Sequence, residues 1–291
     1  MDNIIIVTES GADIPAAMKE QYGIYILPMH VTMEDKDLDD GMFPIREIFD
    51  YYQKNKKIPS TSATNPEEYH LCFEEIHKQY PNKKILHLCY SAVTTSTFQN
   101  SLIASEGMDY VYHLDTKNVS GGQAAIIKKI AEHLRKYPHT TMEELQEKAK
   151  EWIKRARFSF LPGDLAYLKA GGRVSNAQYL GATLLNLKPL IEVKEGYLIG
   201  TKKYRGSMGK VCRKMVLDMI EQYRYENDFL WLLYSEGLAQ AIRTEMEELI
   251  KEKGYSNVEW IKTGGVVTVH SGPGAFGIIG FEPVTDISIL L

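Results

Sequence analysis

The first half of the chain alternates short apolar runs with stretches in which apolar residues recur at helical spacing. Apolar runs bounded by polar turns are typical of buried strands, and they occupy residues 4–7, 24–31, 84–90 and 110–114. Helical spacing follows these runs at residues 14–22, 44–55, 67–79, 98–106 and 123–136, while 58–66 is a polar segment without it. Strands that alternate with helices predict a mostly parallel sheet with helices on its faces.

From near residue 158, the second half of the chain has a different order of predicted strands and helices. Residues 189–193 and 197–202 predict a β-hairpin with Gly196 in its turn. The pattern further predicts strands at 229–234, 258–262, 266–270 and beyond 277, and helices at 164–169, 177–186, 208–223 and 240–253. We therefore predict an α/β protein: an N-terminal domain with a parallel sheet (1–158), packed on a second α/β domain with a mostly antiparallel sheet (159–291).

Charge and hydropathy narrow the class of protein. The 291 residues suit two globular domains, and the 34 basic and 38 acidic side chains nearly balance, so no nucleic-acid partner is expected. No apolar run approaches the about 18 residues of a membrane span. The beginning of the sequence lacks the basic region of a signal peptide, so we expect a cytoplasmic protein.

The cysteines give no sign of a metal site or of disulfides. Cys72, Cys89 and Cys212 are far apart in the sequence and form no CxxC pair. We therefore expect each of them to be a small buried apolar side chain, and we expect no metal.

Hydroxyl side chains cluster where predicted strands end. The clusters lie at residues 8–11, 60–62, 91–97 and 115–117. In parallel sheets, ligands bind beyond the carboxyl ends of the strands, where free backbone N–H groups at helix starts also favour anions. The clusters therefore favour a site for a small anion such as a carboxylate or a phosphate. The alternative is that these residues only cap helices.

Two more side chains could bind an anion from the second domain. His270 ends an apolar run and precedes a segment with three glycines, where backbone can approach a ligand closely. Arg205 ends a basic run, which could equally be a solvated turn. The sequence contains no Walker loop, no GxGxxG after the first strand, no GxSxG elbow and no HExxH.

Several segments resemble, in the same order, the motifs of the DegV family. The most specific are the blocks Tyr167–Ser175, Leu184–Pro189 and His270–Gly277, and weaker similarities lie at Thr8–Pro15, Ile58–Ser62, Ser91–Gln99 and Asp115–Lys117. Together they extend from residue 4 to about residue 281. The chain departs from the family pattern at Glu9, where Asp is usual, and at Ser96, where Gly is usual.

The resemblance implies a two-domain protein that binds a long-chain fatty acid in an apolar tunnel, with the carboxylate between the domains. It also implies a separate kinase that phosphorylates the bound fatty acid to an acyl phosphate for phospholipid metabolism. The binding protein itself would then be no enzyme and would need no cofactor.

The resemblance also implies roles for individual residues. Thr61 and Thr95 match carboxylate-binding positions, and Ser62 and Ser96 lie beside them. His270 matches the carboxylate-side histidine of the second domain.

Arg205 matches an arginine on the phosphoryl-transfer or partner-facing side. Two other functions remain open at this point: a carrier or sensor without a kinase, and a small acyl esterase that uses Ser or Thr with His270. The missing nucleophile elbow argues against the esterase. A lipid ligand is also compatible with transient contact with a membrane surface.

Overall fold

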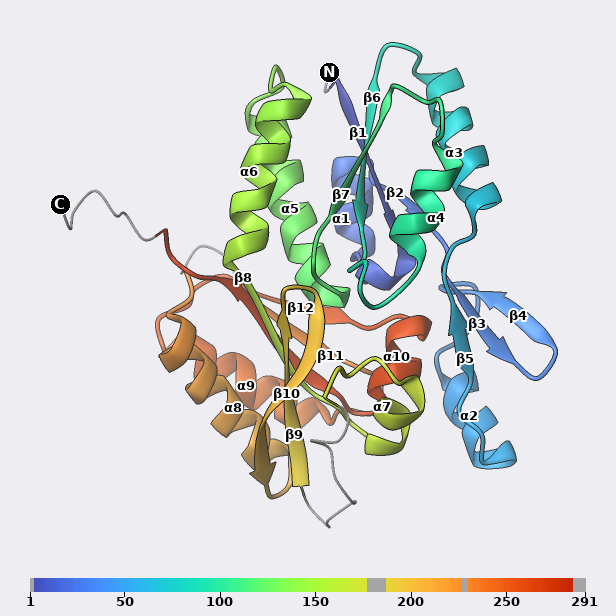
Figure 1. Cartoon of the computed structure of the whole chain (residues 1–291). Helices are drawn as coiled ribbons and strands as arrows, with labels where there is room; N and C mark the ends of the chain where they lie inside the picture. The colour runs from blue at the N-terminus through green and yellow to red at the C-terminus, as the bar shows by residue number, and fades with distance from the viewer. Residues whose placement is uncertain (1–2, 177–186, 227–229, 285–291) are drawn as a thin grey trace.

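The computed structural model describes residues 3–176, 187–226 and 230–284 of the chain. In these residues the strands form three sheets of four, six and three strands. Figure 1 shows the four-stranded sheet and its helices above the six-stranded sheet, with the small sheet to one side. The predicted α/β class is therefore confirmed, including a parallel first sheet and a mostly antiparallel second sheet.

The four-stranded sheet is parallel throughout, with the order β2-β1-β6-β7. Its strands are β1 (Ile4–Glu9), β2 (Tyr25–Leu27), β6 (Lys84–Cys89) and β7 (Val111–Asp115). The helices of this domain include α1 (Ala16–Tyr22), α3 (Pro66–Gln79), α4 (Thr97–Ala104), α5 (Ser120–Lys136) and α6 (Met142–Arg155). Because side chains alternate along a strand, Val7 and Ile85 pack on Phe73 of α3, whereas Ile6 and Leu86 belong to the core on the α5 side.

The small sheet and α2 (Arg46–Asn55) form the side of the first domain. The sheet has the order β4-β3-β5 and is antiparallel, with β3 (His30–Met33), β4 (Lys36–Asp39) and β5 (Ser60–Ser62). The single strand predicted at 24–31 is wrong, because it is divided between β2 and β3. Pro28 lies between them and has no N–H group with which to continue a ladder. Part of the segment predicted to be only polar is β5.

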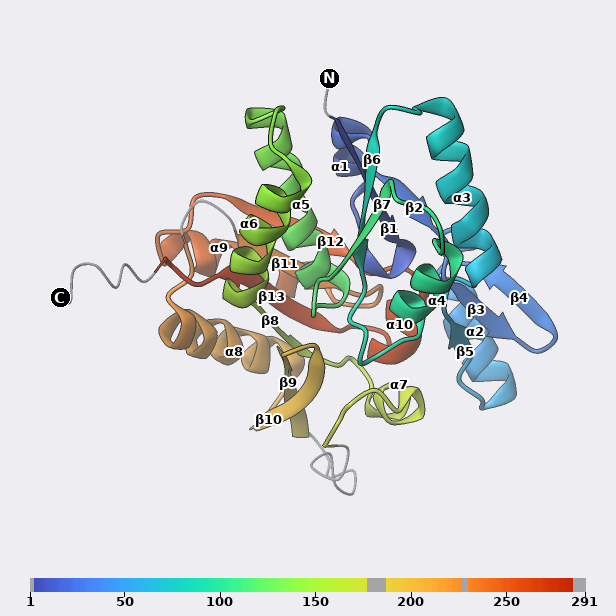
Figure 2. The same cartoon turned by 45° about the horizontal axis from the view of Figure 1, so that its top comes forward.

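The six-stranded sheet has the order β10-β9-β8-β13-β11-β12. Its strands are β8 (Ala156–Leu161), β9 (Leu187–Lys194), β10 (Tyr197–Arg205), β11 (Leu230–Tyr234), β12 (Val258–Lys262) and β13 (Phe276–Phe281). All neighbouring pairs are antiparallel except β11 and β12. The predicted hairpin around Gly196 is confirmed. Figure 2 shows α8 (Met208–Tyr223) and α9 (Gln240–Glu252) on one face of this sheet.

Helix α5 lies between the two large sheets. Residues 120–127 are all buried, a pattern that belongs to a helix enclosed on every side. Side chains of α5 share one core with Leu86 and Leu88 of the first sheet and with Phe158, Leu233 and Ile279 of the second. The two domains are therefore packed together through a common helix.

The strand predicted at 266–270 is wrong, because this segment is the helix α10 (Gly265–Ser271). Carboxylates of the first domain accept hydrogen bonds from the first backbone N–H groups of the helix: Asp13 Oδ1 from Gly264 N and Asp40 Oδ1 from Gly265 N, each at 2.6 Å. These contacts satisfy N–H groups that a helix start leaves unpaired. An apolar run this short fits a strand or a buried helix equally well, so the tertiary contacts decide.

The proposed division near residue 158 falls inside β8, the first strand of the six-stranded sheet. We propose that the second domain begins with this strand. Its first helix after β8 is α7 (Leu165–Gly171), whereas the predicted helix at 177–186 lies outside the described residues. Within the described ranges, no helix combines the length and the apolar character that crossing a bilayer requires.

Candidate functional site

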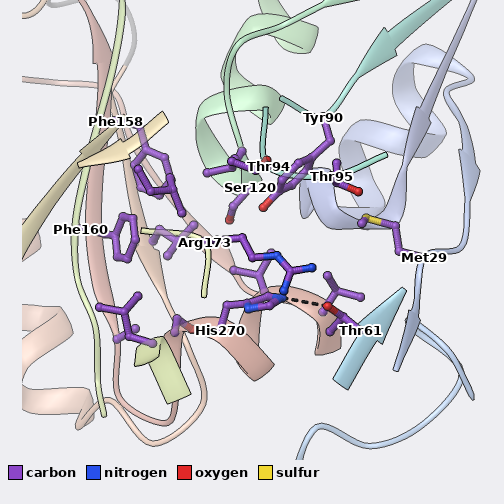
Figure 3. A pocket seen from close by; sticks show the side chains of 18 of the residues that line it. Met29, Thr61, Tyr90, Thr94, Thr95, Ser120, Phe158, Phe160, Arg173 and His270 are labelled. Atoms are coloured by element: carbon purple, nitrogen blue, oxygen red, sulfur yellow. Dashed lines mark hydrogen bonds between the residues drawn. The ribbon is translucent and has the colours of Figure 1, made fainter. Parts of the chain in front are cut away.

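A cavity lies between the two domains. The first domain contributes mainly hydroxyl-bearing side chains to its wall, and the second contributes mainly apolar ones. Figure 3 shows these two groups facing each other across the cavity.

The hydroxyl groups come from four separate places in the first domain. Thr61 lies on β5, Tyr90 follows β6 directly, Thr94 and Thr95 lie in the turn before α4, and Ser120 is the first residue of α5. Tyr90, Thr94, Thr95 and Ser120 meet because the carboxyl ends of parallel strands lie at one edge of the four-stranded sheet, where the next helices begin. Thr61 reaches the same edge from β5 of the small antiparallel sheet. This edge therefore places several hydroxyl groups on the cavity wall, of which Ser120 already donates to Asp13 Oδ2 and Thr94 to the carbonyl of Ser91.

His270 joins this edge from the second domain. Its Nε2 lies 2.9 Å from Oγ1 of Thr61, in a hydrogen bond that connects α10 with β5. Nδ1 of His270 is buried and has no hydrogen-bond partner among the described residues. It packs instead against Gly171 of α7, where an added Cβ would lie 2.3 Å from Nδ1.

The environment of the ring determines which nitrogen carries the proton. Burial, with the positive charge of Arg173 as a second cause, lowers the pKa of His270 to about 4, so the ring is neutral at pH 7. A buried N–H without a partner is rarer in proteins than a buried acceptor without one. This favours the tautomer with the proton on Nε2, in which Nε2–H donates a hydrogen bond to Oγ1 of Thr61. The hydroxyl hydrogen of Thr61 is then free for an acceptor in the cavity, such as a carboxylate oxygen.

Arg173 adds a positive charge to the polar end. It follows the left-handed Gly172 that ends α7, and its Nη1 donates a hydrogen bond to the carbonyl of Gly171 at 2.6 Å. In Figure 3 its guanidinium extends between the hydroxyl groups of the first domain and His270. A guanidinium can donate two parallel hydrogen bonds to one carboxylate, so this end of the cavity suits a carboxylate both by charge and by geometry.

The opposite side of the cavity is apolar. Phe158 and Phe160 lie two residues apart on β8, so both rings face the cavity, with ring centroids 5.5 Å apart. Leu168, Leu198 and Leu233 extend this wall. The cavity can therefore hold a molecule with an anionic head and an apolar body.

The structure brings together four of the residues predicted for the site. Thr61, Ser62, Thr95 and His270 all line the cavity. Ser96 does not, since it is exposed directly before α4.

Arg205 also lies outside the cavity, exposed at the end of β10. The residues that the sequence did not single out are Tyr90, Ser120 and Arg173. Arg173 belongs to the Gly-Gly-Arg block of the family motif, which could have identified it. For the other two residues, the only signal in the sequence was their position: Tyr90 lies at the end of a strand and Ser120 at the start of a helix.

The other two hydroxyl clusters have structural roles. Thr8 and Thr116 donate to backbone carbonyls of β6, at 2.9 Å to Leu88 and 2.7 Å to Cys89. Ser10 donates to Asp40, which in turn accepts from α10. These clusters stabilise the strand ends, and they do not contribute to the wall of the cavity described above.

Comparison with known proteins finds relatives whose names describe fatty acid or lipid binding. A protein of Thermotoga maritima named a fatty acid-binding protein is 28% identical over 285 residues, which cover 94% of this chain and 95% of that protein. A solved structure of a DegV lipid-binding protein from Thermotoga maritima is 26% identical, with a TM-score of 0.81 over 97% of this chain and 99% of that one.

A second solved structure shows the same fold at lower identity. It describes fatty acid binding of a DegV family protein from Thermus thermophilus, and it is 23% identical with a TM-score of 0.86 over 96% of this chain and 99% of that one. The family model described as "Uncharacterised protein, DegV family" matches residues 3–282. The chain therefore belongs to the DegV family.

Proposed function

We propose that this protein binds a long-chain fatty acid in the cavity between its domains. The observation that carries the proposal is the Thr61–His270 hydrogen bond beside Arg173 at the polar end of an otherwise apolar cavity. The relatives whose names describe fatty acid or lipid binding support it. In this proposal the carboxylate accepts hydrogen bonds from Thr61 and Thr95 and is neutralised by Arg173.

The two ends of the cavity would contribute differently to affinity. Burial of an acyl chain gains about 0.8 kcal/mol for each methylene, so the chain supplies most of the favourable free energy. The carboxylate would weaken binding if it were buried without partners, because an unpaired buried charge is costly. The hydroxyl groups and Arg173 therefore orient the ligand and remove that cost.

We further propose that the bound fatty acid is presented to a separate ATP-dependent kinase. A carboxylate oxygen would attack the γ-phosphorus of ATP, the bond to the β–γ bridging oxygen would break, and ADP would leave with that oxygen. The sequence has no Walker loop and no GxGxxG after β1, which supports a nucleotide site on another protein. Arg205 is exposed outside the cavity and would face this partner. Such a reaction would place both proteins in the cytoplasm and the product in phospholipid metabolism.

The esterase alternative is disfavoured by the surroundings of His270. A histidine that acts as a general base for a hydroxyl nucleophile is usually oriented by a third group on its other nitrogen. Nδ1 of His270 has no hydrogen-bond partner among the described residues and packs on Gly171. A carrier or sensor without a kinase would use the same cavity and differs only in its partner.

Titration of the delipidated protein with a long-chain fatty acid tests the binding site. Loss of two hydroxyl donors in the Thr61→Ala/Thr95→Ala variant should weaken affinity by about 100-fold or more, because each hydrogen bond to a charged group contributes about 1.5–3 kcal/mol. The control variant Thr32→Ala/Thr244→Ala removes two hydroxyls away from the cavity and should keep wild-type affinity. Equal affinity of both variants for the fatty acid would contradict the site.

A reaction with ATP and a purified fatty acid kinase tests the presentation step. Trapping with hydroxylamine should yield the fatty acyl hydroxamate, detected by mass spectrometry, only when the binding protein, the kinase and ATP are all present. Arg205→Ala should lower this yield while leaving fatty acid affinity unchanged, whereas the exposed-arginine control Arg46→Ala should leave both unchanged. Absence of the hydroxamate with the loaded wild-type protein would favour the carrier or sensor.

A further inference from the structure

A cluster of metal-ligating side chains lies inside the first domain, away from the cavity. His87 and Cys89 are two residues apart on β6, so they share a face of the sheet, and His113 of β7 pairs directly with His87 in the strand register. This face is covered by α3 and α4. His87 and Cys89 are fully buried, and His113 is partly buried.

The ligand atoms of these three side chains converge. Nδ1 of His87 lies 3.1 Å from Nδ1 of His113 and 3.1 Å from Sγ of Cys89. The ligand atoms of the three residues all lie within 4.8 Å of one another. In a tetrahedral site with bonds of about 2.0–2.3 Å, neighbouring ligand atoms are separated by roughly 3.3–3.7 Å. Small side-chain movements would therefore bring all three to one ion.

Both histidines also have the outer hydrogen bonds that metal-bound histidines have. Nε2 of His87 lies 2.7 Å from Oε1 of Glu9, and Nε2 of His113 lies 2.8 Å from Oγ of Ser105. Metal-bound histidines almost always donate their second N–H to a carboxylate or another oxygen, which orients the ring. Here each ring directs Nδ1 to the centre of the cluster and Nε2 to such an oxygen.

The charges of the cluster fit a divalent ion. The Glu9 carboxylate accepts hydrogen bonds from the hydroxyl of Tyr69 and the backbone N–H of Tyr90, and its Oε1 lies against Nε2 of His87. A divalent ion with one thiolate and the Glu9 carboxylate leaves no net charge in this buried region.

We propose that His87, Cys89 and His113 form a zinc site. Imidazole and thiolate are the ligands that Zn²⁺ prefers, and Oγ of Ser101 lies beside the cluster, 3.3 Å from Nδ1 of His113. On binding, Zn²⁺ replaces the thiol proton of Cys89, which leaves to solvent as a Zn–S bond forms. The spacing of the cysteines gave no sign of this site, because its third ligand comes from the neighbouring strand.

Metal analysis of the full chain tests the proposal. The protein is produced without a histidine tag, in medium supplemented with Zn²⁺ or with Co²⁺, and purified with a non-thiol reductant. We expect elemental mass spectrometry to find about one metal ion per chain. We also expect the absorption spectrum of the Co²⁺ form to show a near-ultraviolet thiolate-to-cobalt charge-transfer band. Cys89→Ala should lose the band and the ion, whereas Cys212→Ala, which removes a buried thiol of α8, should keep both.

Ser105→Ala keeps the test decisive if Cys89→Ala does not fold. Ser105 directly follows α4 and is only partly buried, and its loss should weaken Zn²⁺ affinity by about 10- to 100-fold, as expected for an outer-shell partner. Two results together would overturn the proposal. A brief chelator treatment would remove all Zn²⁺ from the wild-type chain, and the Co²⁺ form would show no thiolate band. The residues would then form only a buried hydrogen-bond network.

Discussion

The hydrogen bond between Thr61 and His270 joins residues 209 positions apart in the sequence. The sequence predicted both as site residues, Thr61 by its hydroxyl cluster and His270 by the glycines that follow it, and both line the cavity. It could not identify their contact, because this depends on how α10 packs against β5. Nor could it show that the ring is neutral, since the cause is burial at the domain interface.

The low pKa of His270 makes a prediction about stability and pH. In the folded protein the ring resists protonation down to about pH 4, while in the unfolded chain it takes up a proton near pH 6.5. The free energy of unfolding should therefore fall as the pH falls from 7 to 5, and this histidine should account for about 2 kcal/mol of the fall. Urea unfolding at both pH values should show a smaller fall in His270→Asn.

The variant His139→Asn serves as the control for this prediction. His139 is exposed and lies away from the cavity, so its replacement should keep the wild-type difference between pH 7 and pH 5. An equal loss of stability on acidification in His270→Asn and in the wild-type chain would contradict the role assigned to burial of His270.

Among the elements, α10 shows where hydrophobic pattern alone is insufficient. Val266, Val267 and Val269 favour a strand by their β-branched side chains, and the sequence pattern predicted one. The helix forms because Asp13 and Asp40 accept hydrogen bonds from its start. By contrast, α8 could be predicted to the residue, because its amphipathic pattern is long and begins next to the turn at Gly206.

Helix α7 packs against α10, and Gly171 is a point of especially close contact between them. Gly171 at the end of α7 lies against the ring of His270, and a Cβ there would be 2.3 Å from Nδ1. Gly171→Ala should displace the ring from Thr61 and weaken fatty acid affinity by about tenfold, with a loss of about 1–3 kcal/mol in the free energy of unfolding. Titration calorimetry and urea unfolding measure the two effects.

Gly209→Ala is the matched control for Gly171→Ala. Gly209 lies in α8, where the nearest atom to an added Cβ is 3.5 Å away, an ordinary contact. Alanine favours helix over glycine, so this variant should be at least as stable as the wild-type chain and should bind the fatty acid normally. If Gly171→Ala were as stable and bound as tightly as Gly209→Ala, the proposed support of His270 by α7 would be wrong.

At the scale of the whole molecule, the sequence predicted two α/β domains and the types of their sheets. It could not predict that α5 is enclosed by both sheets, since an apolar helix face does not show which element packs against it. The same limit applied to His87, Cys89 and His113, which only the register of β6 and β7 brings together. Periodicity determines which elements form, whereas contacts between elements determine the site.

Analysis of the lipid carried by the purified protein tests the central claim most directly. Denaturation and organic extraction, followed by quantitative mass spectrometry, should release about one long-chain fatty acid per chain, and the Thr61→Ala/Thr95→Ala variant should release less. The control Thr32→Ala/Thr244→Ala should carry the same amount as the wild-type protein. A wild-type protein that releases no fatty acid, and that takes up none when long-chain fatty acids are added, would contradict the account.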